Sequence, residues 1–272
     1  VLKVLIVGCG YLGTALGERL AGKNHEVWAL RRDKEALKTL TAKGLRPFRA
    51  DLLKPESLKT LPAFHAAILC QASDKKESYE QVYYQATRNI LDTLWRQELK
   101  KLILISSTGV YGHMDGSWVD EKDDTRKTGA ADRDAEWLLK TEDIVLSESQ
   151  GTVFRLGGIY GPGRNRLKAL KEGRLKPSFS EAYANRIHVD DAVSGIQLLL
   201  EKGRPKEVYL GVDDHPSTQK EFYEWLCPKL GLSLEFDVSS KETACISNKR
   251  CLNKKIITLG LRLKYPTFQE GY

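Results

Sequence analysis

The residues with the clearest chemical potential form the pattern G-x-G-x-x-G over residues 8–13, GCGYLG. An uninterrupted apolar run, residues 4–7, precedes them, and leucines follow at helical spacing. A strand, a glycine turn and a helix in this order create an anion-binding site, because the N–H groups at the helix start point at the ligand. We therefore predict a dinucleotide-binding turn made by Gly8, Gly10, Tyr11, Leu12 and Gly13; the alternative is an ordinary strand-to-helix turn.

The choice between the two nicotinamide cofactors depends on the end of the second expected strand, residues 26–30. An NAD-specific site places an acidic residue there for the ribose hydroxyls. This chain has Arg31 and Arg32 instead, and a guanidinium group binds a phosphate through two parallel charged hydrogen bonds. We expect NADP rather than NAD, although Asp33 could still serve a ribose and the arginines could simply be solvated.

Composition limits the classes of function. The chain has 272 residues, 41% hydrophobic and 29% charged, as in a globular protein, and no apolar run approaches a membrane-spanning length. Five scattered cysteines without a C-x-x-C pair indicate reduced thiols, no metal site and a cytoplasmic protein. The net charge of +7 could suggest nucleic acid, but acidic residues are interleaved with the basic ones. We therefore expect a phosphorylated small molecule as partner, and neither nucleic acid nor membrane.

The elements that must position these residues alternate along the chain. Strands are expected at residues 3–7, 26–30, 46–52, 66–70, 102–105, 152–156 and 208–211. Helical spacing marks residues 77–99 and the segment from 131 to 146. Alternation of this kind predicts a doubly wound parallel α/β sheet, a Rossmann fold. We expect residues 1–163 to form the dinucleotide-binding domain, with 188–212 returning to it, and residues 164–187 and 213–272 to form a small substrate lobe.

Four further segments support one family when taken together with the glycine turn. They are RADL at 49–52, SSTGVYG at 106–112, RLGGIYGPGR at 155–164 and IHVDD at 187–191. In this order they resemble the extended short-chain dehydrogenases/reductases, in particular the branch of nucleotide-sugar epimerases and dehydratases. The resemblance covers nearly the whole chain and includes the G-x-G-x-x-G variant of atypical members.

The resemblance implies roles for individual residues. Ser107 falls where the family has a catalytic serine or threonine, which hydrogen-bonds the reacting oxygen of the substrate; the simpler interpretation is a serine that bonds local backbone. Tyr111 is the aromatic group nearest to it. Further cofactor contacts are implied for Asp51, Leu52, Gln71, Ala72, Ser106, Gly157 and Ile159, and substrate contacts for Tyr160, Arg164 and Arg186. The two arginines indicate an acidic substrate, unless they are only solvated charges, and His188 is expected to be structural.

One departure from the family is chemically important. The Tyr-x-x-x-Lys pair, whose tyrosine is the acid/base, would fall on Thr128 and Asp132, and no tyrosine in the chain has a lysine four residues later. A positioned acid/base contributes about 10²- to 10⁴-fold in rate. The groups that could replace it are Tyr111, Tyr160, Lys127 and His113, and the sequence selects none of them with certainty.

Two functions from different classes follow. The first is an enzyme that transfers hydride to or from a carbonyl or alcohol of a phosphorylated or nucleotide-linked sugar, as an epimerase or a reductase. The second is a cofactor-binding sensor or scaffold that has lost catalysis. The family resemblance also implies a possible homodimer through the helices at 77–99 and 131–146.

Overall fold

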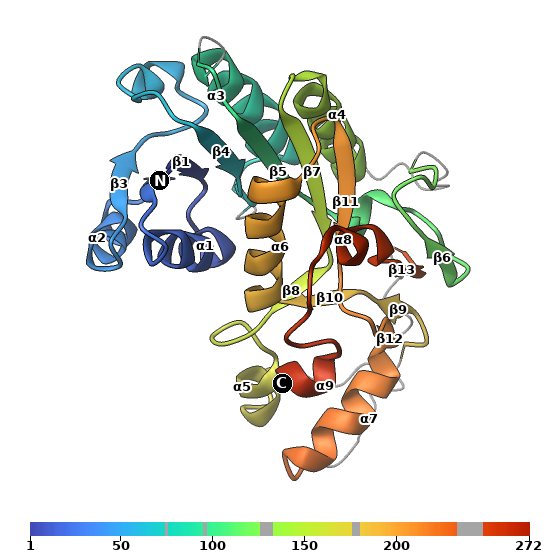
Figure 1. Ribbon diagram of the computed structural model, residues 1–272. Helices are drawn as coiled ribbons and strands as arrows, with labels where there is room; N and C mark the ends of the chain where they lie inside the picture. Colours follow the sequence, from blue (N-terminus) through green and yellow to red (C-terminus); the bar gives the residue numbers. More distant parts are fainter. Residues whose placement is uncertain (74–75, 95–96, 126–132, 176–179, 233–246) are drawn as a thin grey trace.

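The computed structural model describes residues 1–73, 76–94, 97–125, 133–175, 180–232 and 247–272 (Figure 1). Its main element is a seven-stranded sheet in the order β11-β7-β5-β4-β1-β2-β3, in which every neighbouring pair is parallel. The strands are β1 (Lys3–Val7), β2 (Glu26–Arg31), β3 (Arg46–Arg49), β4 (Ala66–Leu69), β5 (Lys101–Ser107), β7 (Gly151–Leu156) and β11 (Glu207–Gly211). The predicted Rossmann-type sheet is confirmed.

Helices cover both faces of this sheet (Figure 1). One face packs on α1 (Tyr11–Ala21), α2 (Lys34–Ala42) and α6 (Val189–Lys202), and the other on η1 (Pro55–Leu58), α3 (Ala86–Leu94) and α4 (Arg133–Ser147). All residues of β4 and β7 are buried, which is why β4 is a continuous apolar run rather than an alternating one; in β7 the buried residues include Thr152 and Arg155.

The helix expected over residues 77–99 differs from the prediction in its bounds and in the type of its first turns. The described chain forms π-helical turns, η2 (Glu80–Gln85), and then the α-helix α3, which ends at Leu94. Apolar residues at a spacing of four predict a helix correctly, but this spacing does not distinguish wide π turns from α turns. The second expected helix corresponds to α4, which begins at Arg133 and ends at Ser147.

A smaller group of elements lies beyond the carboxyl edge of the sheet, in the lower part of Figure 1. The short strands β8 (Gly158–Tyr160) and β10 (Arg186–His188) pair in parallel, and β9 (Tyr183–Ala184) pairs antiparallel with β12 (Ser217–Thr218). Around them lie the helices α5 (Leu167–Lys171), α7 (Gln219–Lys229) and α9 (Phe268–Gly271). These elements share a core of their own, which includes Tyr160, Leu170, Phe222 and Phe268.

The described residues 113–125 contain a short strand that the sequence patterns do not predict. In β6 (Ser117–Val119), Trp118 is exposed and Val119 is buried, and the strand pairs in parallel with β13 (Lys249–Cys251). A three-residue strand whose partner lies about 130 residues away leaves no local pattern. The 3₁₀ turn η3 (Thr108–Val110) precedes it, and α8 (Lys254–Leu259) packs beside β11.

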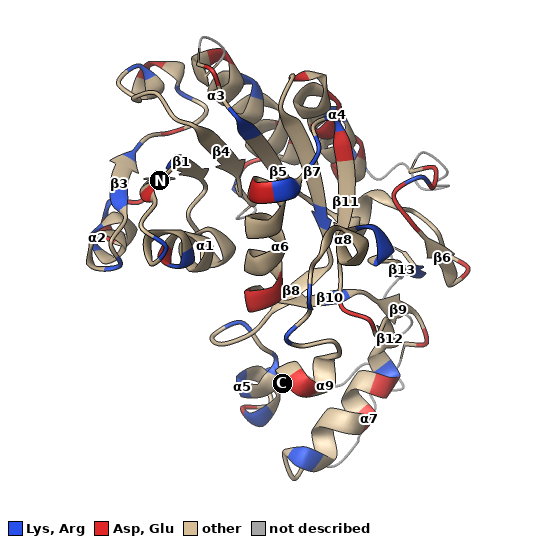
Figure 2. Cartoon of the chain, viewed as in Figure 1, with Lys and Arg blue, Asp and Glu red and all other residues tan. Residues whose placement is uncertain are grey.

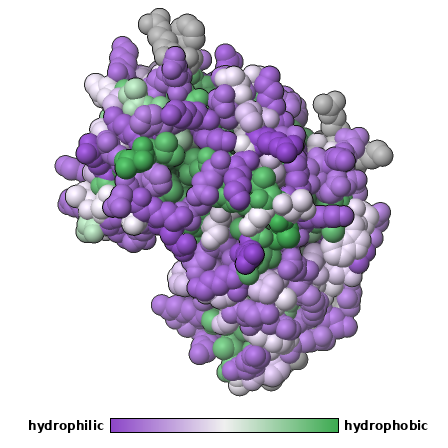
Figure 3. Space-filling model, viewed as in Figure 1, coloured by the Kyte–Doolittle hydropathy of each residue, from purple (hydrophilic) through white to green (hydrophobic). Residues whose placement is uncertain are grey.

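The described surface is mixed in character. Acidic and basic residues are interspersed over the elements in Figure 2, and hydrophilic side chains cover most of the face drawn in Figure 3. Within the described ranges, no helix combines the length and the apolar character needed to cross a bilayer.

Candidate dinucleotide and substrate site

The glycine turn joins β1 to α1 at the carboxyl edge of the sheet. Gly8 has φ of +80°, and a Cβ atom there would lie 2.6 Å from the backbone of Gln71. A Cβ atom on Gly13 would lie 2.9 Å from the carbonyl oxygen of Gly8, so this glycine lets the helix approach the turn. Around Gly10, in contrast, no described atom lies within 4 Å of such a Cβ position. Two glycines are therefore required by the fold, whereas Gly10 borders open space where a pyrophosphate could approach the backbone.

Basic residues gather where β2 ends. Arg31 reaches back to the turn and donates from Nη1 to the Cys9 carbonyl oxygen at 3.1 Å. Arg32 forms an ion pair with Glu77, and Arg49 donates to the Arg32 carbonyl oxygen at 3.3 Å. Asp33 caps α2, since its Oδ1 accepts from the Glu35 N–H at 2.9 Å. Arg31 is thus beside the predicted phosphate site, and the Asp33 carboxylate is engaged in a helix cap.

The predicted adenine-side residues hold their own loop. Asp51 Oδ1 accepts from the Leu53 N–H at 3.1 Å, and the Leu52 carbonyl oxygen accepts from Asn89 at 2.7 Å. Neither hydrogen bond tests a contact with the cofactor, so the cofactor contacts of Asp51 and Leu52 stay predictions.

Gln71 and Ala72 follow β4, next to the glycine turn. Gln71 is buried and donates from Nε2 to Thr87 Oγ1 at 2.8 Å, but its Oε1 has no hydrogen-bond partner among the described residues. A buried amide oxygen without a partner is costly, and a bound ligand that donates to it would remove that cost.

Ser106 and Tyr111 take part in a buried network behind the site. Ser106 Oγ donates to Glu142 at 2.5 Å, and Glu142 forms an ion pair with Arg155 at 2.6 Å. Arg155 in turn donates to the Tyr111 hydroxyl at 2.7 Å. All four side chains are buried. Their polar groups satisfy one another, so the hydroxyl of Ser106 is engaged inside the network and its contact with the cofactor stays a prediction.

Tyr111 is also unsuited to the predicted catalytic role. Its side chain is 0% exposed, and its hydroxyl donates to the Asp120 carbonyl oxygen at 2.8 Å while it accepts from Arg155. Burial raises the pKa of Tyr111 well above its ordinary value. A fully buried hydroxyl with both hydrogen-bonding functions engaged cannot reach a substrate, and we correct the prediction accordingly.

Ser107 stands one residue further out, where β5 ends. It is half-buried, and its Oγ accepts from the Gly109 N–H at 3.0 Å, which caps the η3 turn. The local backbone role is therefore present. Because the hydroxyl uses only its acceptor side in this bond, its hydrogen can still be donated to a ligand.

The segment after β7 connects the sheet to the smaller group of elements. Gly157 donates its N–H to the Gly211 carbonyl oxygen at 3.0 Å, and a Cβ atom on Gly157 would lie 2.8 Å from the Asn185 carbonyl oxygen. Ile159 packs against the core of the sheet. The cofactor contacts of both residues stay predictions.

Tyr160 is buried within an aromatic group. Its ring stacks on Tyr272 at 4.8 Å and meets His188 edge-on at 5.3 Å. Burial raises the pKa of the Tyr160 hydroxyl, which argues against it as a replacement acid/base. His188 has the expected structural role, because its Nδ1 accepts from the Asp190 N–H at 3.2 Å and caps α6.

The two predicted substrate arginines lie in different surroundings. Arg164 is exposed, and its guanidinium lies 5.5 Å from the ring centroid of Tyr11, whose hydroxyl donates to Pro162 at 3.0 Å. The structure thus brings Arg164 to the cofactor turn. Arg186 is largely buried; it lies 4.7 Å from the Phe222 ring and donates to Ser217 at 2.6 Å.

The remaining candidates for an acid/base do not form a pair. His113 has a buried Nδ1 that lacks a hydrogen-bond partner within the described ranges. Lys127, Thr128 and Asp132 lie outside the described residues. Sequence reasoning missed Glu142 and Asp213, since neither has a local signal: each becomes notable only when the fold buries its carboxyl group.

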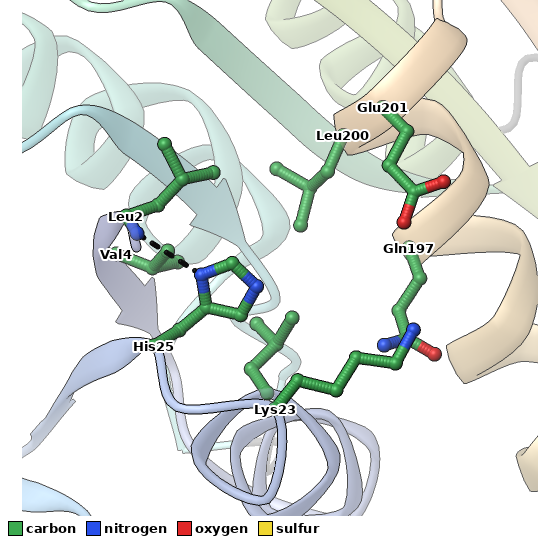
Figure 4. Close-up of a pocket in the computed structure, with 8 residues that line it drawn as sticks. Leu2, Val4, Lys23, His25, Gln197, Leu200 and Glu201 are labelled. Carbon is green, nitrogen blue, oxygen red and sulfur yellow. Dashed lines mark hydrogen bonds between the residues drawn. The ribbon is translucent and has the colours of Figure 1, made fainter.

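A small hollow of about 90 Å³ lies far from this site (Figure 4). Its lining includes Leu2, His25 and Glu201, and His25 Nδ1 accepts from the Leu2 N–H at 3.1 Å. It borders the amino end of β1, whereas the glycine turn follows the carboxyl end, so it is separate from the candidate site. In the part of the chain that is described, no cluster of His, Cys, Asp or Glu side chains could hold a metal ion.

Comparison with known proteins agrees with this geometry. Protein YeeZ of Escherichia coli K12 is 24% identical over 276 residues, which cover 97% of this chain and 96% of YeeZ. A structure from Methylobacillus flagellatus, described as an NAD-dependent epimerase/dehydratase, is 29% identical, covers 100% of this chain and 96% of its own, and has a TM-score of 0.82. The NAD complex of Thermus thermophilus UDP-glucose 4-epimerase has the same fold, with 20% identity, coverage of 99% and 96%, and a TM-score of 0.80.

The family model of the NAD dependent epimerase/dehydratase family matches residues 4–211, from β1 to the end of β11. This range includes the glycine turn and all seven strands of the large sheet. The chain belongs to the NAD dependent epimerase/dehydratase family.

Proposed function

We propose that the protein binds a nicotinamide dinucleotide and transfers hydride to or from a carbonyl or alcohol carbon of a phosphorylated or nucleotide-linked sugar. The observation that carries this proposal is the turn around Gly10, where the backbone borders open space at the start of α1. The N–H groups there and the helix dipole favour a pyrophosphate. The unpartnered Oε1 of Gln71 on the same edge further supports a bound ligand.

NADP(H) is the proposed cofactor rather than NAD(H), and Arg31 supports this choice. Its guanidinium reaches the turn from the end of β2, where a 2′-phosphate would lie, and Asp33 is engaged as a helix cap. NAD(H) remains the alternative, since the two relatives described as NAD-dependent or NAD-bound belong to the same fold.

Ser107 is the proposed contact to the reacting oxygen. When bound, the nicotinamide supplies hydride transfer. Ser107 can donate to the carbonyl oxygen of the substrate while the Gly109 N–H fixes its Oγ. Tyr160 and Arg186 are the proposed substrate contacts, and Arg164, which lies beside Tyr11, is proposed to reach either the cofactor or an acidic substrate group. Neither Tyr111 nor Tyr160 is assigned as the acid/base.

Cofactor titration tests this function directly. NADPH and NADH are titrated by fluorescence into the wild type, into Arg31→Ala/Arg32→Ala, and into Arg46→Ala as the control. Arg46 is an exposed arginine at the opposite end of the same strands, paired with Glu26. We expect the double variant to bind NADPH about 10- to 100-fold more weakly and NADH nearly unchanged, as for the loss of charged hydrogen bonds to a phosphate. Absence of binding for both cofactors would refute the proposal.

A sensor or scaffold without catalysis is the second candidate. The observation that favours it is the engagement of Tyr111 in the buried network, in a chain without a Tyr-x-x-x-Lys pair. Tight cofactor binding without turnover across a panel of nucleotide sugars would support it, whereas accumulation of a specific sugar in a deletion strain would exclude it.

The location, oligomeric state and domain boundaries of the protein are part of the same proposal. Four cysteines of the described residues are free thiols, which supports a cytoplasmic location. We also propose a homodimer through α3 and α4, and two domains with the boundaries given above. Light scattering behind a sizing column tests the dimer, and a monomer would exclude it.

A further inference from the structure

One buried carboxyl group is not explained by the fold or by the proposed chemistry. Asp213, two residues beyond β11, is 1% exposed. Its Oδ1 accepts from the His215 N–H at 3.2 Å, but its Oδ2 is buried and has no hydrogen-bond partner among the described residues. Burying a carboxyl oxygen without a donor is costly, so this oxygen marks a position that the donor of a ligand would satisfy.

Asp213 lies on the edge of the sheet where the proposed chemistry takes place. In the register of the strands, Leu156 is paired with Ser107 on one side and with Gly211 on the other. Neighbouring strands are roughly 4.8 Å apart, which puts the end of β11 about 10 Å from Ser107. In open α/β sheets ligands bind beyond this carboxyl edge.

Arg186 connects Asp213 to aromatic residues of the smaller group of elements. The Asp213 N–H donates to the Arg186 carbonyl oxygen at 2.7 Å, and the Arg186 guanidinium attracts the Asp213 carboxylate. Phe222 and Phe268 lie 4.7 and 5.6 Å from that guanidinium. An acceptor beside a donor complements a hydroxyl-bearing carbon better than it complements an anion, because the positive charge of Arg186 already faces Asp213.

We propose that Asp213 is a substrate-binding residue that accepts a hydrogen bond from a hydroxyl of the sugar through Oδ2, with Arg186 as the neighbouring donor. This inference rests on the proposed function and deepens it. It assigns the buried end of the substrate site to a neutral polyhydroxylated group. Acidic groups of the substrate are then left to the exposed Arg164.

The proposal predicts that part of a proton is released when the sugar binds. Burial raises the pKa of Asp213 to about 8, and Arg186 opposes this shift. The other ionisable groups facing it are Asp191 from α6, Asp214, and Tyr160 from β8. A hydroxyl that donates to Oδ2 stabilises the ionised carboxylate and lowers its pKa, so sugar binding at pH 7.5 should release a fraction of a proton.

The experiment is calorimetric titration of the NADPH-loaded protein with UDP-glucose and with dTDP-glucose at pH 7.5. The reduced cofactor prevents oxidation of the sugar during the titration. Two buffers with different heats of ionisation report the proton released. We expect release in the wild type, and in Asp213→Asn its loss together with about 10- to 100-fold weaker binding. Glu224→Gln, at an exposed carboxylate of α7 that is not among the groups facing Asp213, is the matched control and should behave as the wild type.

The outcomes separate the two proposals. Equal sugar affinity in Asp213→Asn and the wild type would overturn the role of Asp213, as would sugar binding by the wild type without proton release, a result that needs no variant to fold. Binding of neither sugar to a wild type that binds NADPH would also overturn it. Failure to bind NADPH or NADH at all would instead refute the proposed function.

Discussion

The glycine turn and the network behind Ser107 lie on neighbouring parts of one sheet but are built in opposite ways. At the turn, backbone atoms border open space at Gly10. Behind Ser107, the corresponding volume is filled by Ser106, Tyr111, Glu142 and Arg155, which satisfy one another without a ligand. The comparison indicates that the glycine turn is open to a ligand, whereas the polar groups behind Ser107 satisfy one another and serve stability.

The largest expected effect is at the buried network. Glu142→Ala leaves Arg155 buried without its carboxylate, and removing one partner of a buried ion pair typically costs about 3–5 kcal/mol. Urea denaturation should show a loss of that size in the free energy of unfolding. The control is Glu136→Ala, whose exposed pair with Lys140 should contribute far less to the free energy of unfolding. Similar losses in the two variants would contradict the structural role of the network.

An intermediate effect separates the glycines of the turn. Gly10→Ala should leave the free energy of unfolding nearly unchanged, because no described atom lies within 4 Å of the new methyl group, yet weaken NADPH binding at least tenfold. Gly8→Ala should destabilise the fold by about 1–3 kcal/mol, since its φ is positive and the methyl group would meet Gln71. Thermal denaturation and fluorescence titration measure the two effects. Tight NADPH binding by a folded Gly10→Ala protein would place the cofactor elsewhere.

The smallest expected effect tests the role of the basic residues where β2 ends. Glu77→Gln removes the ion-pair partner of Arg32, which is partly exposed, so the free energy of unfolding should change by less than about 1 kcal/mol. Loss of the negative charge of Glu77 should strengthen NADPH binding by a few-fold at low salt and leave NADH binding as it was. Equal changes in the affinities for NADPH and NADH would show that these basic residues do not contact a 2′-phosphate.

The parts of the molecule that the sequence predicted are those with local causes. The apolar run of β1 and the glycines after it define the turn within eleven residues, and the alternation of strands and helices defines the sheet. The burial of Ser106 and Tyr111 in a hydrogen-bonded network could not be predicted from a local pattern. Their partners, Glu142 and Arg155, are about 35 to 45 residues away and become neighbours only when α4 packs against β5 and β7.

Asp213 illustrates the same limit. In sequence it is one of two adjacent aspartates in a loop, and nothing distinguishes it from Asp214. The fold buries the first and exposes the second. The short strand β6 escaped notice for a related reason, because its pairing partner is remote.

The pairing of β6 with β13 also bears on how the molecule assembles. Ser117 and Lys249 lie side by side although about 130 residues separate them, and β11 joins β7 only after the chain has formed the elements between them. Contacts of such long sequence separation close late and slow the search for the native state. During synthesis, β6 would therefore stay without its partner strand until residues 249–251 had been made.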